Sequence, residues 1–354
     1  MPNKVVRVGI AGQGRSGFAI HARWLREAPG QYRIVAVADQ IEERRAQASR
    51  EFGCRSYDDY RKLVSDQELD LFVNALPSHL HPQGTIAALE AGRPVVCEKP
   101  FAVTVEDADR VIAAARKSGK LLAPFQNSRF YPFFVEMQKV IQSNKLGQIV
   151  YIRSNWGGFS RRWDWQTRQE FWGGSLNNTG PHPMDQAIML FGEGTPEVFC
   201  RMECRNPFGG DADDFCLVVL YGRNAPTIEV MLSSYQAYPQ GEMYNISGAL
   251  GGLTGGPDGL KWKYFDPEKA PKQAMWRPWS ENRNYCSEKL PWIEESWSAA
   301  PNADSFQDNS RAFYNNVYDA LVNGAQLVVT PEQVRRQVAV IQECHRQNPL
   351  PVKR

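Results

Sequence analysis

The chain has 354 residues and a formal net charge of only +2. Its basic residues are scattered, with no run longer than the pairs Arg44-Arg45 and Arg161-Arg162, which argues against a nucleic-acid partner. Seven cysteines without a CxxC pair predict neither a metal site nor a disulfide framework. No leader and no apolar run of roughly 18 residues is found, so we expect a cytoplasmic chain without a membrane partner, divided into two domains.

The first element predicted is a strand followed by a glycine-rich turn and a helix. In "VVRVGIAGQGRSG" the glycines fall at Gly12, Gly14 and Gly17, and the helix-like "FAIHARWLREA" follows. Such glycines permit a tight turn, close approach of a pyrophosphate, and close helix packing, in that order. The turn residues between them, which we assign to the same cofactor site, are Gln13, Arg15 and Ser16.

A second strand, "YRIVAVAD", ends at Asp39, 22 residues beyond Gly17. A carboxylate at this distance accepts hydrogen bonds from the adenosine ribose and repels a 2′-phosphate. Arg44 and Arg45 come a helical turn later and are expected to face solvent. The sequence therefore predicts a dinucleotide site that prefers NAD, with NADP the less favoured cofactor.

Strands and helices then alternate, which predicts a parallel sheet covered on both faces. Helices are expected over 42–53, 57–66, 81–92 and 104–119, and strands over 69–77, 93–100 and 120–125. Because ligands bind at the carboxyl ends of such strands, the strand-end stretches "ALPSHLH" and "CEKP" are the ones to examine.

His182 lies in "NNTGPHPMD", between two prolines that fit only the first turn of a helix. There the helix dipole favours the neutral imidazole that a proton acceptor needs. The alternative is a helix-start histidine satisfied by the backbone. Asp185, one turn later, could hydrogen-bond His182 or face the first domain.

Nine of the ten tryptophans lie beyond residue 150. Tryptophans among arginines and acids suit the rim of a sugar pocket better than a core. The substrate-binding candidates are Trp156, Arg161, Arg162, Trp163, Asp164 and Trp165. Residues 266–304 are expected to form a long excursion from a sheet, either a lid or an oligomer contact. Residues 248–259 are expected to form a hairpin connection, and 330–347 a capped amphipathic helix.

The motifs "GIAGQGRSG", "VAVAD", "NALPSHLHPQGTIAALEAGRPVVCEKP", "FQNSRFYPFF" and "GGSLNNTGPHPMD" together resemble the glucose–fructose oxidoreductase / inositol dehydrogenase / rhizopine-catabolism (Gfo/Idh/MocA) family over essentially the whole chain. The resemblance implies an α/β protein with a Rossmann domain over 1–125. It implies a second α/β domain over 126–354 on a large, open, mostly antiparallel sheet, whose C-terminal helix could pack back on the first domain. That sheet often forms a homodimer or homotetramer interface.

The resemblance also assigns site residues. Lys99 matches the lysine of the family's Glu-Lys-Pro motif, which reaches the substrate hydroxyl, and we predict a cis peptide between Lys99 and Pro100. Asn178 stands where the family has a carboxylate, so we expect it to bind substrate rather than to charge-stabilise His182. The remaining cofactor-binding candidates are Ala75, Leu76, Pro77, His79, His81, Glu98 and Asn127.

The resemblance implies an NAD-dependent oxidoreductase acting on a carbinol of a sugar, cyclitol or glycoside. We expect His182 to take the hydroxyl proton and Lys99 to polarise the oxygen. One alternative is a redox-assisted glycoside-cleaving enzyme that recycles its NAD. Another is a non-catalytic regulator that binds NAD and sugar, although such a protein needs neither Lys99 nor His182.

Overall fold

A computed structural model describes residues 4–238, 240–274, 287–300 and 305–352 of the chain. Its first part is a parallel six-stranded sheet, sheet A, in the order β3-β2-β1-β4-β5-β6. The strands are β1 (Val6–Ala11), β2 (Tyr32–Ala38), β3 (Arg55–Tyr57), β4 (Leu71–Asn74), β5 (Val95–Cys97) and β6 (Leu122–Pro124). Strands β2 and β3 are added on one side of β1, and β4, β5 and β6 on the other. A ligand crevice is expected at this change of side, at the carboxyl ends of β1 and β4.

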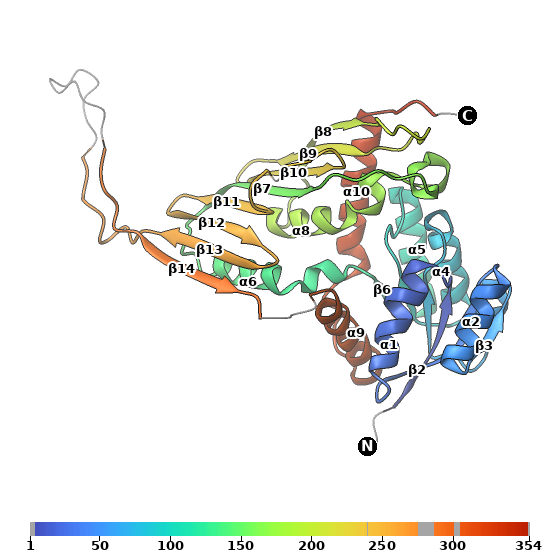
Figure 1. Cartoon of the computed structure of the whole chain (residues 1–354). Helices are drawn as coiled ribbons and strands as arrows, with labels where there is room; N and C mark the ends of the chain where they lie inside the picture. The colour runs from blue at the N-terminus through green and yellow to red at the C-terminus, as the bar shows by residue number, and fades with distance from the viewer. Residues whose placement is uncertain (1–3, 239, 275–286, 301–304, 353–354) are drawn as a thin grey trace.

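Helices flank sheet A as the alternating pattern predicted (Figure 1). They are η1 (Arg15–Ala22), α1 (Arg23–Glu27), α2 (Glu42–Phe52), α3 (Tyr60–Val64), α4 (His81–Glu90) and α5 (Val105–Ser118). Helix α5 begins where Thr104 Oγ1 accepts the amide of Asp107 at 3.1 Å, and it ends at Gly119, whose φ is +63°. One difference from the prediction lies in the glycine-motif helix, whose first eight residues, η1, are wound as a π-helix.

The second part of the chain is built on an eight-stranded sheet, sheet B, in the order β14-β13-β12-β11-β7-β10-β9-β8. Only the pair β7–β10 is parallel, which confirms a mostly antiparallel sheet. The strands are β7 (Ile149–Gly157), β8 (Glu197–Glu203), β9 (Phe215–Tyr221), β10 (Thr227–Ser233), β11 (Tyr244–Gly248), β12 (Gly251–Gly256), β13 (Gly259–Tyr264) and β14 (Ile293–Ser298).

Two predictions about this sheet were wrong. The glycine-rich stretch 248–259 contains a whole strand, β12, between two tight turns, because glycines 251, 252 and 255 let the neighbouring backbones approach closely. The stretch 266–304 is not entirely an excursion, since β14 returns from it to pair with β13. Residues 275–286 and 301–304, and with them Trp276 and Trp279, lie outside the described residues.

Sheet B has one covered face and one open face. Helices α6 (Pro132–Gln142), α8 (Pro181–Phe191) and α10 (Pro331–Gln347) lie against one side (Figure 1). Strands β9 and β10 alternate accordingly: Val218 and Val230 are buried under the helices, while Leu217 and Met231 are half-buried on the other face. Helix α8, which carries His182, is thus one of the helices on the covered face of sheet B.

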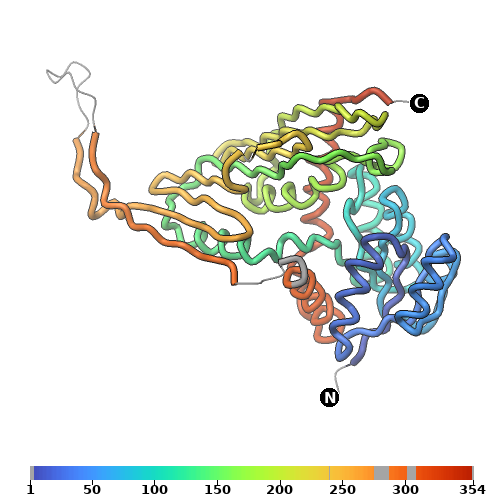
Figure 2. Tube along the Cα trace, in the orientation of Figure 1, coloured from blue at the N-terminus to red at the C-terminus, as the bar shows by residue number. Residues whose placement is uncertain are grey.

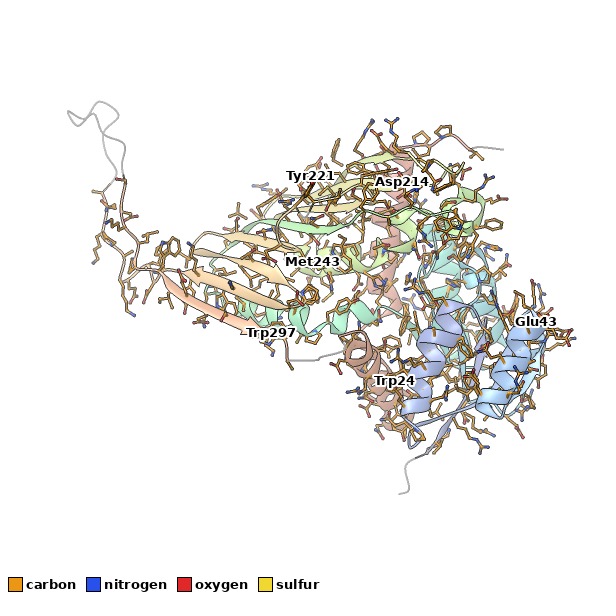
Figure 3. The ribbon with its side chains drawn as sticks, viewed as in Figure 1. Trp24, Glu43, Asp214, Tyr221, Met243 and Trp297 are labelled. Atoms are coloured by element: carbon orange, nitrogen blue, oxygen red, sulfur yellow. The ribbon has the colours of Figure 1, made fainter. Side chains whose placement is uncertain are left out.

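The last two helices return to the first domain, as the tube in Figure 2 shows. On α9 (Ser305–Asn323), Tyr314 stacks on Trp24 with ring centroids 4.9 Å apart, and its carbonyl accepts the hydroxyl of Tyr32 at 2.7 Å. Trp24 is therefore a core residue beside α9 (Figure 3). Helix α10 begins with a capping box formed by Thr330 and Gln333, as its sequence predicted.

Short elements complete the connections near the sheet edges. They are η2 (Ser78–Leu80), η3 (Asn127–Phe130), η4 (Trp165–Thr167), η5 (Gln169–Phe171) and α7 (Ser175–Asn178). None of the helices among the described residues is both long and apolar enough to span a membrane. Within the same residues, no group of three or more acidic, histidine or cysteine side chains is arranged to hold a metal ion.

Candidate active site

The glycine turn after β1 has the geometry of a dinucleotide cradle. Gly12 has a φ of +89°, and a Cβ there would lie 2.2 Å from the carbonyl oxygen of Ala75. A Cβ at Gly17 would lie 1.8 Å from the carbonyl of Gly12, so η1 packs directly on the turn. Gly14 is different, because its nearest neighbour would be a guanidinium nitrogen of Arg44 at 4.0 Å. The open space at Gly14 fits the pyrophosphate of a dinucleotide.

Asp39 lies beside this turn and has more partners than the sequence suggested. Its Oδ2 accepts the backbone amide of Gln13 at 2.7 Å and its Oδ1 that of Ile41 at 2.9 Å. Arg44 reaches within 3.8 Å of Oδ2, and the Arg45 guanidinium donates to the carbonyl of Asp39 at 2.8 Å. Arg44 is exposed, as expected, although its guanidinium lies near the carboxylate. The expectation was wrong for Arg45, which is half-buried because its guanidinium folds back onto the carbonyls of Asp39 and Gln40.

The loop after β4 carries the next group of cofactor candidates, and Ala75, Leu76 and Pro77 lie there at the strand end. His81 holds this loop, with Nε2 2.8 Å from the carbonyl of Leu76 and Nδ1 2.8 Å from that of Pro100. His79 faces the other domain, its ring centroid 5.8 Å from that of Phe171. His81 is thus a brace between two strand-end loops, whereas His79 lies at the domain boundary.

Asn127, the last cofactor candidate, is buried beside α9. Its Nδ2 lies 3.4 Å from Ser310 Oγ, so this amide is oriented by α9. The other turn residues differ in exposure: Arg15 is exposed and Ser16 half-buried. Arg15 lies close enough to Lys99 to act on its charge.

Glu98 and Lys99 follow β5, and the peptide between Lys99 and Pro100 is cis, as predicted. Glu98 is buried, with Oε1 3.2 Å from His21 Nε2 and Oε2 accepting the amide of Lys99 at 2.9 Å. Burial alone would raise the pKa of Glu98, but the hydrogen bond and charge of His21 outweigh it and lower this pKa to about 2. His21 Nδ1 in turn lies 2.6 Å from the Tyr314 hydroxyl. A buried anion therefore lies directly under the lysine.

Lys99 crosses from sheet A to the second domain. Its Nζ donates to the backbone carbonyl of Asn178 at 2.8 Å and to Asn178 Oδ1 at 3.2 Å. Gln166 Nε2 donates to the same Oδ1 at 3.0 Å. Burial lowers the pKa of Lys99, and the charge of Glu98 opposes that shift. The asparagine found in place of the family's carboxylate thus holds the lysine, while its role as a substrate ligand stays a prediction.

His182 lies one helical turn beyond Asn178, in the first turn of α8. Its ring stacks on that of Trp156, with centroids 6.4 Å apart and planes 16° apart. Burial and the charge of Lys99 lower the pKa of His182 to about 3, so the imidazole is neutral. Among the described residues, Nδ1 has no hydrogen-bond partner. Asp185 does not orient it, because its carboxylate makes a buried bidentate pair with Arg129, at 2.9 and 2.5 Å.

Of the other substrate candidates, Arg161 and Arg162 lie with Asn178 in the wall of a cavity of about 350 Å³. The remaining candidates do not line it: Trp156, Trp163, Asp164 and Trp165. The Arg162 guanidinium donates to Asp164 at 2.6 Å and also to Gln166. Trp163 is 76% exposed and Trp165 42% exposed, which agrees with a rim rather than a core. Sequence reasoning missed Gln166, His21 and Tyr314, whose roles depend on partners distant in the chain.

The six-stranded parallel sheet with its open glycine turn is a Rossmann sheet. The second domain adds His182, which lies close enough to Lys99 to be affected by its charge. Together they define the class of two-domain nicotinamide-dinucleotide oxidoreductases. Residues 6–125 match the model for the oxidoreductase family with an NAD-binding Rossmann fold, and residues 134–254 match the GFO/IDH/MocA C-terminal domain. The chain belongs to the Gfo/Idh/MocA oxidoreductase family.

Relatives and solved structures agree with this assignment. An uncharacterised oxidoreductase of Schizosaccharomyces pombe is 27% identical over 349 residues, covering 90% of each chain. Inositol 2-dehydrogenase 2 of Saccharopolyspora erythraea is 29% identical over 81% of this chain and 84% of its own. The NADP(+)-dependent scyllo-inositol 2-dehydrogenase IolW of Bacillus subtilis is 25% identical over 95% and 92%. The putative oxidoreductase yvaA of Bacillus subtilis shares the fold, with a TM-score of 0.79, 20% identity, and 99% and 97% coverage.

Proposed function

We propose that the protein oxidises a carbinol of a sugar, cyclitol or glycoside, with His182 as proton acceptor and Lys99 as the group that polarises the oxygen. The observation that carries this proposal is the bond from Lys99 Nζ to Asn178, one helical turn before His182, across the boundary between the domains. It holds the ammonium group near the start of α8, close enough to His182 for its charge to lower the pKa of the imidazole. Polyol dehydrogenation is also what the inositol dehydrogenases among the relatives are named for.

The two side chains divide the proton chemistry between them. His182 accepts the hydroxyl proton, and its low pKa keeps the imidazole free to do so at neutral pH. The ammonium of Lys99 stabilises the negative charge that develops on the oxygen. Asn178 and Gln166 hold the ammonium on the second domain's side of the cleft. The nicotinamide supplies the hydride acceptor when it is bound.

For the cofactor, the proposal is NAD in preference to NADP. Asp39 presents a carboxylate at the end of β2, where it would bind ribose hydroxyls and repel a 2′-phosphate. Arg44, 3.8 Å from that carboxylate, weakens the preference because a guanidinium can bind the phosphate instead. We therefore expect NADP to be a slower cofactor rather than an excluded one.

The test is direct: the purified protein is incubated with NAD or NADP and a panel of cyclitols, sugars and methyl glycosides, and absorbance of the reduced cofactor is followed. At least one polyol should give stoichiometric reduction, faster with NAD. A protein that binds NAD and polyol without turnover would instead be a regulator, and the proposal would be withdrawn.

A second candidate is redox-neutral cleavage of a glycoside with recycled NAD. The cavity beside Asn178 favours it, since it extends beyond the space for one ring. Product analysis separates the two functions: cleavage releases the aglycone without accumulation of NADH, whereas dehydrogenation accumulates NADH.

We also propose that the protein is a homodimer or homotetramer through the open face of sheet B. Apolar side chains gather there across three adjacent strands, with Phe199 53% exposed on β8 next to half-buried Val219, Leu217 and Met231. Light scattering after gel filtration should give two or four subunits. Phe199→Glu should lower that number.

A further inference from the structure

The cavity beside the catalytic contact extends away from Lys99 into the second domain. Gln166 and Asn178, which hold the lysine, form its inner wall. Its outer wall comes from the end of β7 and from the turn between β8 and β9, which contributes Asp213 and Asp214. Figure 3 shows Asp214 at that end of sheet B. An alcohol placed at Lys99 and His182 would therefore have room beyond it on this side.

Asp213 provides a buried acceptor in this wall. Its side chain is 4% exposed and its Oδ2 accepts the amide of Leu176 at 2.8 Å. Its Oδ1, in contrast, has no partner among the described residues. Gly174 borders the same cavity and packs on this oxygen, since a Cβ there would lie 2.0 Å from Oδ1. The buried oxygen therefore lies directly behind a glycine of the cavity wall. Burial raises the pKa of Asp213 to about 7, so near neutrality the carboxyl can accept or donate a hydrogen bond.

Arg161 provides a matching donor. It is exposed, its guanidinium lies 4.7 Å from the ring centroid of Phe208, and no acidic partner is found for it among the described residues. The other charged groups of the wall are already engaged. Arg162 binds Asp164 at 2.6 Å, and both oxygens of Asp214 accept the amide of Arg205, at 3.0 and 3.1 Å.

Aromatic faces complete the wall. Phe159 and Tyr235 line the cavity and are 64% and 41% exposed. Exposed rings beside a donor and an acceptor suit a pyranose, whose C–H faces pack on aromatic rings while its hydroxyls need both kinds of hydrogen bond. A phosphate fits less well, because Asp214 lines the same space and two of the arginines in the wall are already paired, Arg162 with Asp164 and Arg205 with Glu203.

We propose that this cavity is a second sugar subsite, which binds the neighbouring ring of a glycoside while the first ring lies between Lys99 and His182. The inference rests on the proposed function and narrows it, because it makes the preferred substrate a disaccharide or larger glycoside rather than a free cyclitol. Arg161 and Asp213 are its specificity residues.

The experiment compares cellobiose, maltose and trehalose with the matching methyl glucosides, using kcat/KM for cofactor reduction. At least one disaccharide should exceed its methyl glucoside by about tenfold or more. Arg161→Ala and Asp213→Asn should each lower that ratio by about tenfold, the usual size of a lost charged hydrogen bond. Arg223→Ala, an exposed arginine on the turn between β9 and β10, serves as the matched control and should leave the ratio unchanged. Thermal unfolding checks that each variant is folded.

Ratios within about threefold for every pair, or a ratio insensitive to both substitutions, would overturn the subsite. If no sugar reduces the cofactor, the proposed function fails, and calorimetry with the same sugars decides the subsite on its own. Tighter binding of a disaccharide than of its methyl glucoside, lost in Arg161→Ala, would then support the subsite. Equal affinities would refute it.

Discussion

The glycine turn at the edge of sheet A and the contact between Lys99 and Asn178 are built from different atoms. At the glycine turn the shape comes from backbone: glycines 12, 14 and 17 create the space, and Gln13 contributes its amide to Asp39. At the Lys99–Asn178 contact the shape comes from long side chains, since Lys99 reaches Asn178 across 79 positions of sequence. A backbone site is damaged by added atoms, whereas a side-chain site is damaged by removed ones.

The largest effect is expected from removing the imidazole. His182→Ala should lower kcat by about 10²–10⁴, the usual contribution of a general base. Cofactor affinity, measured by quenching of protein fluorescence, should change little, because the glycine turn lies in the other sheet. A loss of kcat below about threefold would show that His182 is not the proton acceptor. The contrast between a backbone site and a side-chain site would then no longer hold.

Adding a methyl group tests the glycine turn. Gly17→Ala places a Cβ 1.8 Å from the Gly12 carbonyl, so turn and helix must separate, and we expect a loss of about 1–3 kcal/mol in urea unfolding. Gly14→Ala is the matched control, because its Cβ has no neighbour closer than 4.0 Å. It should change stability by less than about 0.5 kcal/mol yet weaken NAD binding. Equal destabilisation by both would mean that Gly14 is structural too.

The same difference explains what the sequence could predict. The strand–turn–helix around Gly12 and the helix start at Pro181 depend on residues within a few positions of one another, so their geometry follows from local chemistry. The family motifs also identified Lys99 and His182 as site candidates. The partners around them could not be predicted from the sequence, because the contacts of Lys99 with Asn178 and of His21 with Tyr314 depend on how distant segments pack.

Smaller misreadings have the same origin. Arg45 was expected in solvent because a full helical turn separates it from Asp39 along the chain, but its guanidinium donates to the carbonyl of Asp39 at 2.8 Å. Strand β14 was missed because its pairing with β13 fixes its conformation, and no alternation of apolar residues marks "IEESWS" as a strand.

Arg44 gives a test of intermediate size. Arg44→Ala should lower kcat/KM for NADP by about tenfold, since one charged hydrogen bond to a phosphate is lost, and should change that for NAD by less than about threefold. Arg45→Ala is the comparison, because its guanidinium donates to the carbonyls of Asp39 and Gln40. Equal effects on both cofactors would show that Arg44 only supports the fold of the turn.

The smallest change is expected in the pH dependence of kcat/KM. A free histidine gains its proton near pH 6.5, but burial and the charge of Lys99 lower the pKa of His182 to about 3. The neutral form is therefore kept as the pH falls from 8 to 5, and activity should stay nearly level over that range. Folding stability, in contrast to activity, should fall as the pH falls. The unfolded chain binds this proton below pH 6.5 and the folded one does not, so His182 lowers the free energy of unfolding as the pH falls from 6.5 toward 3.

Lys99 should determine the alkaline limb of the pH profile of kcat/KM. Its pKa is lowered by burial, so the ammonium loses its proton, and the enzyme its polarising charge, below the pH at which a free lysine titrates. Lys99→Arg keeps the charge at every accessible pH and should remove this alkaline limb, at a lower maximal rate, because the planar guanidinium fits the contacts to Asn178 less well. An acid limb near pH 6.5, or an alkaline limb that persists in Lys99→Arg, would show that other groups set the profile and that the two side chains do not share one alcohol.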